Sequence, residues 1–131
     1  MKNCNLKLVG LRTAKLAKEK GFNIPVFDCI NENEEIGDRD QDCIPVNFNK
    51  FPTVQGSTQN LYSAPTQYEL QDWLRINHKL HIETQYYYGW RGKVVNISTS
   101  NPKIVWGSEM YDDFHKFIEQ ALLQSLISII V

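Results

Sequence analysis

The sequence predicts an α+β fold, with an antiparallel sheet of three to five strands and about three helices packed mainly on one face of it. Three observations carry this prediction: an amphipathic helix with a capping box, alternation with a period of two directly after it, and a second amphipathic segment near the end of the chain. The chain has 131 residues and a net charge of −1. A chain of this length is expected to form a single domain, residues 1–131, around one core.

The first element is a short helix over Thr13–Lys20, which Gly21 ends in the left-handed conformation so that Phe22 folds back over the last turn. Residues 24–27 are expected to form an edge strand, because the proline among them has no N–H to donate to a neighbour. The polar, acidic run from residue 31 to residue 42 is expected to be a loop.

A second short strand is expected over Cys43–Phe48, and a long irregular connection over Asn49–Ser63. A capping box then marks the start of the second helix, because Thr66 and Glu69 stand three residues apart and each can accept a hydrogen bond from an unpaired N–H. One face of this helix is apolar at helical spacing. Its stripe consists of Leu70, Trp73, Leu74 and then Ile76 or Leu80.

After this helix, polar and apolar residues alternate, which predicts a β-hairpin within residues 81–99. Gly89-Trp90-Arg91-Gly92 is expected to form its loop, which places Tyr86 opposite Val95. Opposed residues share a face, and this register separates an apolar face from a polar one. The predicted apolar face consists of Ile82, Thr84, Tyr86, Val95 and Ile97.

Lys103–Trp106 is expected to form a third strand, with Ile104 and Trp106 on one face. The last helix is expected to begin near Asp112, and its final turns are apolar nearly all round. Apolar residues on its second face are Leu123, Ile127 and Ile130. These three either form a homodimer interface or are covered by another part of the chain, and the sequence leaves both alternatives open.

The charges are unevenly distributed: residues 1–21 hold six basic groups and one acidic group, whereas residues 28–42 hold seven acidic groups and one basic group. A net charge near zero argues against a dedicated duplex-DNA-binding protein. Cys4, Cys29 and Cys43 cannot all pair within one chain, and no signal-like apolar run precedes them. We therefore expect a cytoplasmic protein with reduced thiols and no membrane association.

No metal and no cofactor are expected. Asp38–Asp42 begins like a calcium loop, but Cys43 stands where glycine is needed and Asn49 where a bidentate glutamate belongs. His78 and His81 could serve zinc together with a cysteine, but their spacing matches no zinc-finger pattern. His78 is better explained by the favourable position of a cationic ring at a helix C-terminus.

Four segments resemble a group of small proteins encoded by phages and integrated mobile elements of gut bacteria. The segments are Thr13-Ala-Lys-Leu-Ala-Lys-Glu-Lys-Gly-Phe, Tyr62-Ser-Ala-Pro-Thr-Gln-Tyr-Glu-Leu-Gln-Asp-Trp-Leu-Arg, His81-Ile-Glu and Tyr111-Asp-Asp-Phe. Within them, the pattern Ser-Ala-Pro-Thr-x-Tyr-Glu-x-Gln-x-Trp-Leu-Arg is the most specific element. The resemblance implies a phage or prophage origin and a shared fold, and it implies no activity and no functional residues.

The candidate binding residues are Tyr87, Trp90, Arg91 and Lys93, because aromatic groups beside basic ones at a hairpin tip can stack on bases or anchor a protein interface. Alternatively, Trp90 packs on its own sheet or helix. The sequence favours a non-catalytic accessory protein of a phage or mobile element that acts through protein–protein contacts. One alternative is a single-stranded nucleic-acid or nucleotide-binding module that uses residues 87–93.

A small hydrolase with a Cys–His pair is the third hypothesis. The sequence contains no nucleophile elbow, phosphate-binding loop or dinucleotide fingerprint, so it gives catalysis no positive support.

Overall fold

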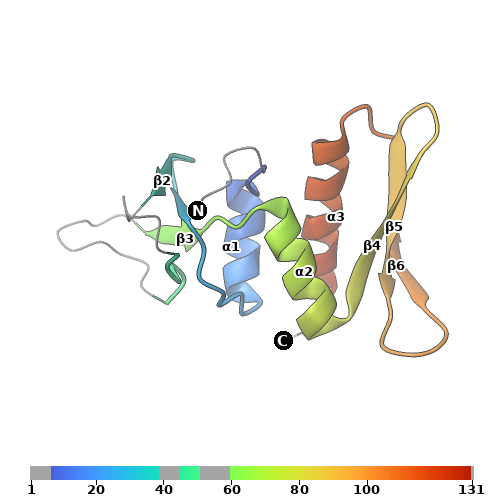
Figure 1. Ribbon diagram of the computed structural model, residues 1–131, viewed down its shortest axis with the longest axis horizontal. Coiled ribbons are helices and arrows are strands. Elements are labelled where there is room, and N and C mark those ends of the chain that lie inside the picture. Colours follow the sequence, from blue (N-terminus) through green and yellow to red (C-terminus); the bar gives the residue numbers. More distant parts are fainter. Residues whose placement is uncertain (1–6, 39–44, 51–59, 131) are drawn as a thin grey trace. The chain divides into compact units, whose positions relative to one another are not determined.

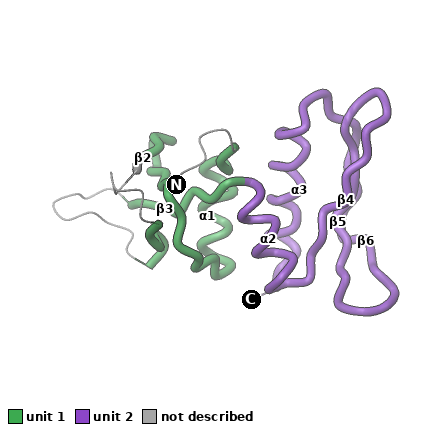
Figure 2. The backbone as a smooth tube through the Cα atoms, viewed as in Figure 1, with its two compact units in different colours: residues 1–66 green, residues 67–131 purple. Residues whose placement is uncertain are grey.

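The computed structural model describes residues 7–38, 45–50 and 60–130. The chain divides into two compact units, residues 1–66 and 67–131, and each is described by itself (Figure 2). In chain order the elements are α1 (Leu11–Glu19), β1 (Asp28–Asn31), β2 (Ile36–Asp38), β3 (Leu61–Ser63), α2 (Gln67–His78), β4 (Leu80–Tyr86), β5 (Trp90–Asn96), β6 (Lys103–Gly107) and α3 (Phe114–Ser128). Within the described ranges there are thus three helices and two three-stranded antiparallel sheets, which confirms the α+β class (Figure 1).

The first unit is built on the sheet β2-β1-β3, against which α1 packs through β1 and β3. Every residue of the central strand β1 is buried, as expected for a strand with a neighbour on each side and a helix on one face. Apolar side chains from α1, β1 and the connections form the core of this unit. They include Val9, Ala14, Ala17, Phe22, Val26, Ile30 and Phe48.

The end of α1 follows the sequence prediction closely. Gly21 has φ 95°, the left-handed conformation that glycine adopts without steric cost. The N–H of Phe22 donates to the carbonyl of Ala17 at 2.9 Å, and the N–H of Gly21 donates to that of Lys18 at 3.1 Å. This pair of bonds is a Schellman motif, and it buries the Phe22 side chain over the last turn.

The predicted acidic loop is wrong in part, because β2 lies inside it and pairs with β1. A tight turn makes this pairing possible. The side-chain oxygen of Asn31 accepts hydrogen bonds from the N–H groups of Asn33 at 2.9 Å and Glu35 at 3.0 Å, and Glu34 has φ 63°. Asparagine stabilises such turns through its own side chain, and this signal outweighs the polarity of the segment.

The two short strands expected in the first unit are reduced to a single bridge between Val26 and Val46, with N–H to carbonyl distances of 2.9 and 2.8 Å. The first two residues of the predicted strand over 43–48 lie outside the described residues. The predicted irregular connection over 49–63 ends in β3, and its residues 51–59 also lie outside the described part of the chain.

The second unit consists of the sheet β4-β5-β6 with α2 and α3 on the same side of it (Figure 1). Helix α2 begins directly after Thr66, as the capping box predicts. The predicted stripe is buried on the core side at Leu70, Trp73 and Leu74, whereas Ile76 is exposed. The first residue of α2, Gln67, is buried and joins the two helices: its side-chain amide donates to the His115 carbonyl at 3.0 Å and to the Glu119 carboxylate at 3.1 Å.

The predicted register of the hairpin is wrong. Strand β4 pairs Tyr86 with Trp90, Thr84 with Gly92 and Ile82 with Val94, so the loop is residues 87–89 instead of 89–92. Tyr86 is consequently exposed, and the buried apolar pair on the helix side is Ile82 and Val94.

Gly92 explains the difference, because it is a strand residue and not a turn residue. A Cβ atom at this position would overlap the carbonyl oxygen of Glu83 and would lie 2.8 Å from Cζ of Phe117. Phe117, from α3, is completely buried. A glycine inside a strand can mark such a close approach, and here it lets the ring of α3 pack against the hairpin.

A β-bulge changes the predicted face of β6. Val94 pairs with Trp106 but the next residue, Val95, pairs with Ile104, so one extra residue of β6 lies between the two pairs. Trp106 stacks on Phe117 with 6.5 Å between ring centroids, whereas Ile104 is exposed. The prediction that Ile104 and Trp106 share a face is therefore wrong.

Helix α3 begins one residue after Asp113, whose carboxylate accepts hydrogen bonds from the N–H groups of His115 at 2.7 Å and Lys116 at 3.1 Å. These bonds are the main reason that the Asp113 pKa is held below its ordinary value. The expected start near Asp112 is thus confirmed to within two residues.

The stability of the second unit should depend strongly on Trp73. We expect Trp73→Ala to lower the free energy of unfolding by about 3–5 kcal/mol, because a large buried aromatic is removed. The control is Ile76→Ala on the exposed face of the same helix, which should change the stability by less than about 0.5 kcal/mol. Chemical denaturation measures both, and equal effects would show that the helix face is misassigned.

Two glycines of the same sheet provide a second matched test. Gly92→Ala should destabilise the protein by roughly 1–3 kcal/mol, because its Cβ meets backbone and a buried ring. A Cβ at Gly107, on the neighbouring strand, has no atom within 4 Å, so Gly107→Ala should be within about 0.5 kcal/mol of neutral. Thermal unfolding of the two variants checks this, and a tolerated Gly92→Ala would refute the close approach.

Candidate functional site

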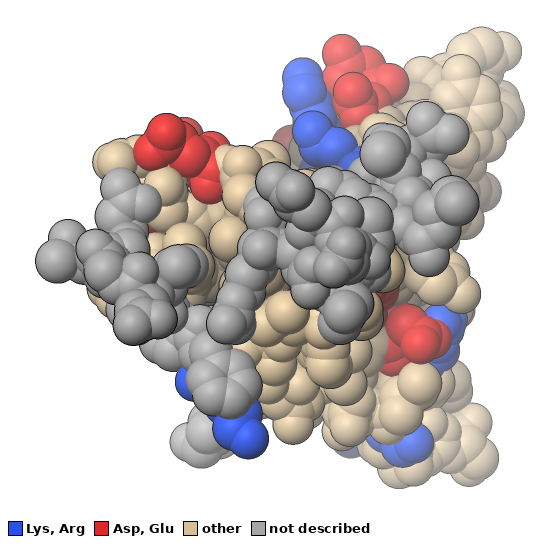
Figure 3. Space-filling model, turned by 60° about the vertical axis from the view of Figure 1, so that its left-hand side comes forward, with Lys and Arg blue, Asp and Glu red and all other residues tan. Residues whose placement is uncertain are grey.

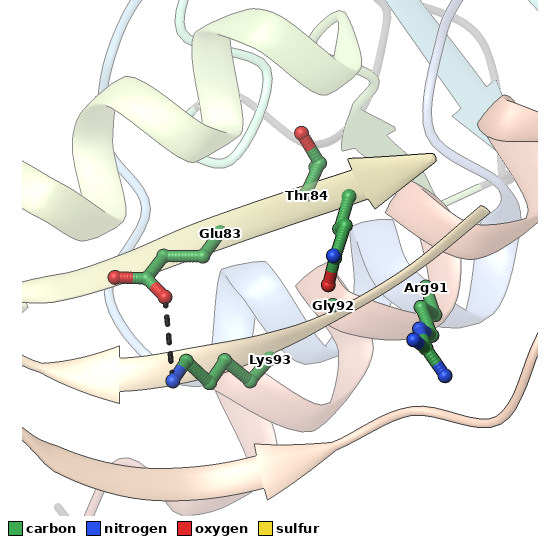
Figure 4. Close-up of a pocket in the computed structure, with 6 residues that line it drawn as sticks. Glu83, Thr84, Arg91, Gly92 and Lys93 are labelled. Atoms are coloured by element: carbon green, nitrogen blue, oxygen red, sulfur yellow. Dashed lines mark ion pairs between the residues drawn. The ribbon is translucent and has the colours of Figure 1, made fainter. Parts of the chain in front are cut away.

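The face of the β4–β5 hairpin that points away from α2 and α3 is exposed and carries the main candidate site. Glu83 stands opposite Lys93 and Gln85 opposite Arg91, so these four side chains share one face. Together with Thr84 and Gly92 they line an open hollow of about 410 Å³ (Figure 4).

The charges in this hollow are only partly compensated. The Glu83 carboxylate and the Lys93 ammonium point toward one another, with Oε2 and Nζ 3.5 Å apart (Figure 4). An ion pair this exposed contributes about 0–1 kcal/mol, but it neutralises the charge of Lys93 locally. Arg91 is exposed and forms no ion pair within the described part of the chain. The hollow therefore presents one free guanidinium, with the Gln85 amide opposite it.

Three successive tyrosines form the tip of the hairpin next to this hollow. Tyr86, Tyr87 and Tyr88 are 64%, 61% and 84% exposed. Tyr88 has φ 57°, a left-handed conformation that costs roughly 1–2 kcal/mol in a residue with a side chain. The rings of Tyr87 and Tyr88 meet edge to face, with 4.7 Å between their centroids. The tip thus holds a strained and exposed aromatic pair.

Trp90 packs against other residues of the second unit. Its ring lies 4.8 Å from that of Phe114 in α3 and 5.0 Å from that of Tyr86, measured between centroids. Its backbone N–H and carbonyl each exchange a hydrogen bond of 2.7 Å with Tyr111. The half-buried indole therefore packs between the hairpin and the last helix.

The structure divides the four predicted binding residues among three places. Tyr87 is at the tip, Arg91 and Lys93 line the hollow, and Trp90 packs toward α3. The sequence prediction missed Glu83 and Gln85, which stand opposite Lys93 and Arg91, because the register that it assumed placed them elsewhere. It also missed the exposed Tyr88 at the tip.

The predicted interface residues of α3 differ in exposure. Leu123 is 5% exposed and is thus covered, whereas Ile127 is 50% exposed and Ile130 is 97% exposed. Only the last two residues lie on the surface of the chain.

A second polar cluster lies in the first unit, where it joins α1 to β3 and to the turn after β1. The Glu32 carboxylate accepts a hydrogen bond from the Tyr62 hydroxyl at 2.5 Å and pairs with the Lys15 ammonium at 3.1 Å. The ammonium groups of Lys15 and Lys18 lie 5.7 and 5.1 Å from the centre of the Tyr62 ring. All of these groups are partly or fully exposed. The network connects α1, the turn after β1 and β3.

The charge states of this cluster reflect the same contacts. The hydrogen bond from Tyr62, followed by that from Lys15, lowers the pKa of Glu32 below its ordinary value. The hydrogen bond to Glu32 raises the pKa of Lys15 and that of Tyr62. The same hydrogen bonds therefore favour an ionised Glu32 and a neutral Tyr62 at neutral pH. These charge states suit a structural role for the cluster.

Charges of both signs also mix elsewhere on the surface. On the face seen in Figure 3, acidic and basic side chains lie in small groups, several of them next to one another, between broad areas of uncharged residues. Among the residues that the structure describes on this face, no extended field of one sign is visible.

The residues considered for metal binding and thiol chemistry are only partly described. Cys29 is a buried free thiol whose Sγ lies 3.5 Å from the carbonyl oxygen of Gly37. The ring of His78 rests against Trp73, with 4.8 Å between centroids, at the end of α2. No group of three His, Cys, Asp or Glu among the described residues could hold a metal ion. Residues 39–43, with most of the calcium-like run, and Cys4 lie outside those ranges.

Comparison with protein-family models, curated proteins and solved structures gives no match to this chain. In the described ranges no helix is both long enough and apolar enough to cross a membrane.

The first-unit cluster predicts a pH effect with a definite sign. Because the Glu32 pKa is lowered on folding, this group contributes stability above its unfolded pKa, and the contribution is lost as the pH falls through the folded pKa. Tyr62→Phe removes the largest cause, so we expect the Glu32 carboxyl pKa to rise toward its ordinary value. Carbon-detected NMR titration measures this, with Tyr68→Phe on α2 as the control. An unchanged Glu32 pKa in Tyr62→Phe would contradict the network.

Proposed function

We propose that this protein is a non-catalytic accessory protein that acts by contacting another protein, and that the tip and open face of the β4–β5 hairpin form the contact surface. The observation that carries the proposal is Tyr88, an aromatic side chain that is 84% exposed and has φ 57°. Glycine or asparagine would occupy this position at lower cost. Strain of this kind at an exposed aromatic, whose ring contact among the described residues is with the likewise exposed Tyr87, supports a contact role.

The neighbouring side chains support a protein as the partner. Tyrosine and arginine are residue types enriched at protein interfaces, and both occur here on the exposed tip and open face of the hairpin. Tyr87 and Tyr88 supply rigid aromatic area, while Arg91 supplies an unpaired guanidinium. A pair of tyrosines in edge-to-face contact is also already ordered, which reduces the entropy lost on binding.

The charges argue against the nucleic-acid alternative. A single-stranded nucleic acid needs a basic groove that follows its backbone in addition to stacking residues. In the hollow, Lys93 is neutralised by Glu83 and only Arg91 remains free. The stacking residue favoured by the sequence, Trp90, is engaged with Phe114.

The setting that we propose is the cytoplasm of a host cell, with the protein encoded by a phage or mobile element. The resemblance of the segment around Trp73 to proteins of such elements supports this origin. Cys29 is buried and forms no disulfide among the described residues, which is in keeping with a reducing compartment.

Tyr88→Asn separates contact from stability. Because asparagine tolerates the left-handed conformation, the variant should melt at or above the temperature of the wild type, yet it should lose its partner. The control is Tyr68→Asn, which changes another exposed tyrosine, on α2. Affinity capture from host lysate should yield one protein with the wild type and the control, and not with Tyr88→Asn.

Three outcomes would contradict the proposal. Capture that survives Tyr88→Asn would place the contact elsewhere, and a lowered melting temperature would give Tyr88 a structural role. Binding of a labelled random single-stranded oligonucleotide, with strong salt dependence and loss in Tyr88→Asn, would replace the protein partner by a nucleic acid.

A further inference from the structure

Strand β4 lies at the edge of its sheet, with β5 as its neighbour in the described part of the chain. The hydrogen bonds of β5 show which backbone groups of β4 point toward this outer edge. The N–H and carbonyl of Trp90 are bonded to Tyr111, and those of Gly92 are bonded to the Oγ and N–H of Ser108 at 2.8 and 2.9 Å. These groups of β5 therefore point away from β4. In an antiparallel pair, two opposed residues either exchange both hydrogen bonds or exchange none.

Thr84 and Tyr86 stand opposite Gly92 and Trp90, so their own N–H and carbonyl groups point away from β5. Among the residues that the structure describes, strand β4 has no other neighbour in its sheet. Residues 83–86 are all exposed. Two N–H and two carbonyl groups in regular extended geometry are thus presented to solvent, which is the template for adding another strand.

The two edges of this sheet differ in protection. Strand β6 follows Pro102, begins with Lys103 and contains the bulge, and each of these features discourages strand addition. The exposed half of β4 has no proline, no lysine and an uninterrupted register with β5. Only β4 is therefore suited to edge pairing among the strands of this sheet.

The side chains of β4 fit a second copy of the same strand. If two β4 strands pair in antiparallel fashion around Thr84, Glu83 stands opposite Gln85 of the other copy, and Ile82 stands opposite its Tyr86. Thr–Thr and aliphatic–aromatic pairs of this kind are favourable, and no like charges meet. A pairing centred one residue earlier would oppose the two Glu83 carboxylates and is disfavoured.

We propose that the free edge of β4 is a homodimer interface, in which β4 of a second copy of this chain adds across a two-fold axis at Thr84 and joins the two sheets. An interface of this size is small, so the dimer is weak and forms at high protein concentration. The dimer uses backbone groups of Thr84 and Tyr86, so the purified protein alone tests it, without the partner that the tyrosine tip contacts.

Two substitutions at Gln85 test the proposed register between the two β4 strands, because they should change the dimer affinity in opposite directions. Gln85→Lys places a cation opposite Glu83 of the other copy twice per dimer, and should tighten dimerisation roughly 2- to 30-fold at low ionic strength. Gln85→Glu places like charges there and should weaken dimerisation by a similar factor. Both changes are at an exposed position, so the fold should be preserved.

Sedimentation equilibrium over a wide concentration range measures the dissociation constants of the wild type and of both variants. Thr84→Pro should abolish the dimer, because it removes an outward N–H that the ladder with β5 does not use. A strictly monomeric wild type would overturn the proposal. A dimer that is indifferent to both Gln85 variants but is disrupted by Ile127→Glu would also overturn it and place the interface on α3.

Discussion

The ring of Phe117 packs where a side chain at residue 92 would stand, and the hairpin can approach α3 this closely only because that residue is glycine. The contact joins the last helix to the middle of the sheet through a completely buried aromatic. It also fixes Gly92 as a strand residue facing the helix. Since opposed residues in a hairpin share a face, one fixed position determines the register of the whole pair.

The features of the candidate site follow from this register. With Gly92 opposite Thr84, the loop is confined to residues 87–89, so the tyrosines project at the tip. Arg91 and its neighbours then face away from the helices and line the hollow. The backbone groups of Trp90 and Gly92 are bonded to Tyr111 and Ser108, so the corresponding groups of Tyr86 and Thr84 point to the edge of β4, where the described part of the chain adds no strand. The same contact therefore positions both proposed surfaces, the tip and the free edge.

Local signals in the sequence predict the end of α1 and the start of α2, whereas α1 begins at Leu11, two residues before the predicted Thr13. The stop at Gly21 and the start after Thr66 depend on residues adjacent in the chain, and both were predicted correctly. The predicted hairpin register is wrong because a glycine at position 92 fits two interpretations, a turn residue or a site of close approach. Only the distant Phe117 decides between them. The bulge in β6 likewise depends on pairing between strands, so the sequence pattern alone could not reveal it.

Nuclear Overhauser contacts between Hα protons test the central claim about the register most directly. In a pair of opposed residues that exchange no hydrogen bonds, the Cα atoms are about 4.5 Å apart and the Hα protons are in contact. The account predicts strong Hα–Hα contacts between Thr84 and Gly92 and between Tyr86 and Trp90. A contact between Tyr86 and Val95 in their place would contradict it.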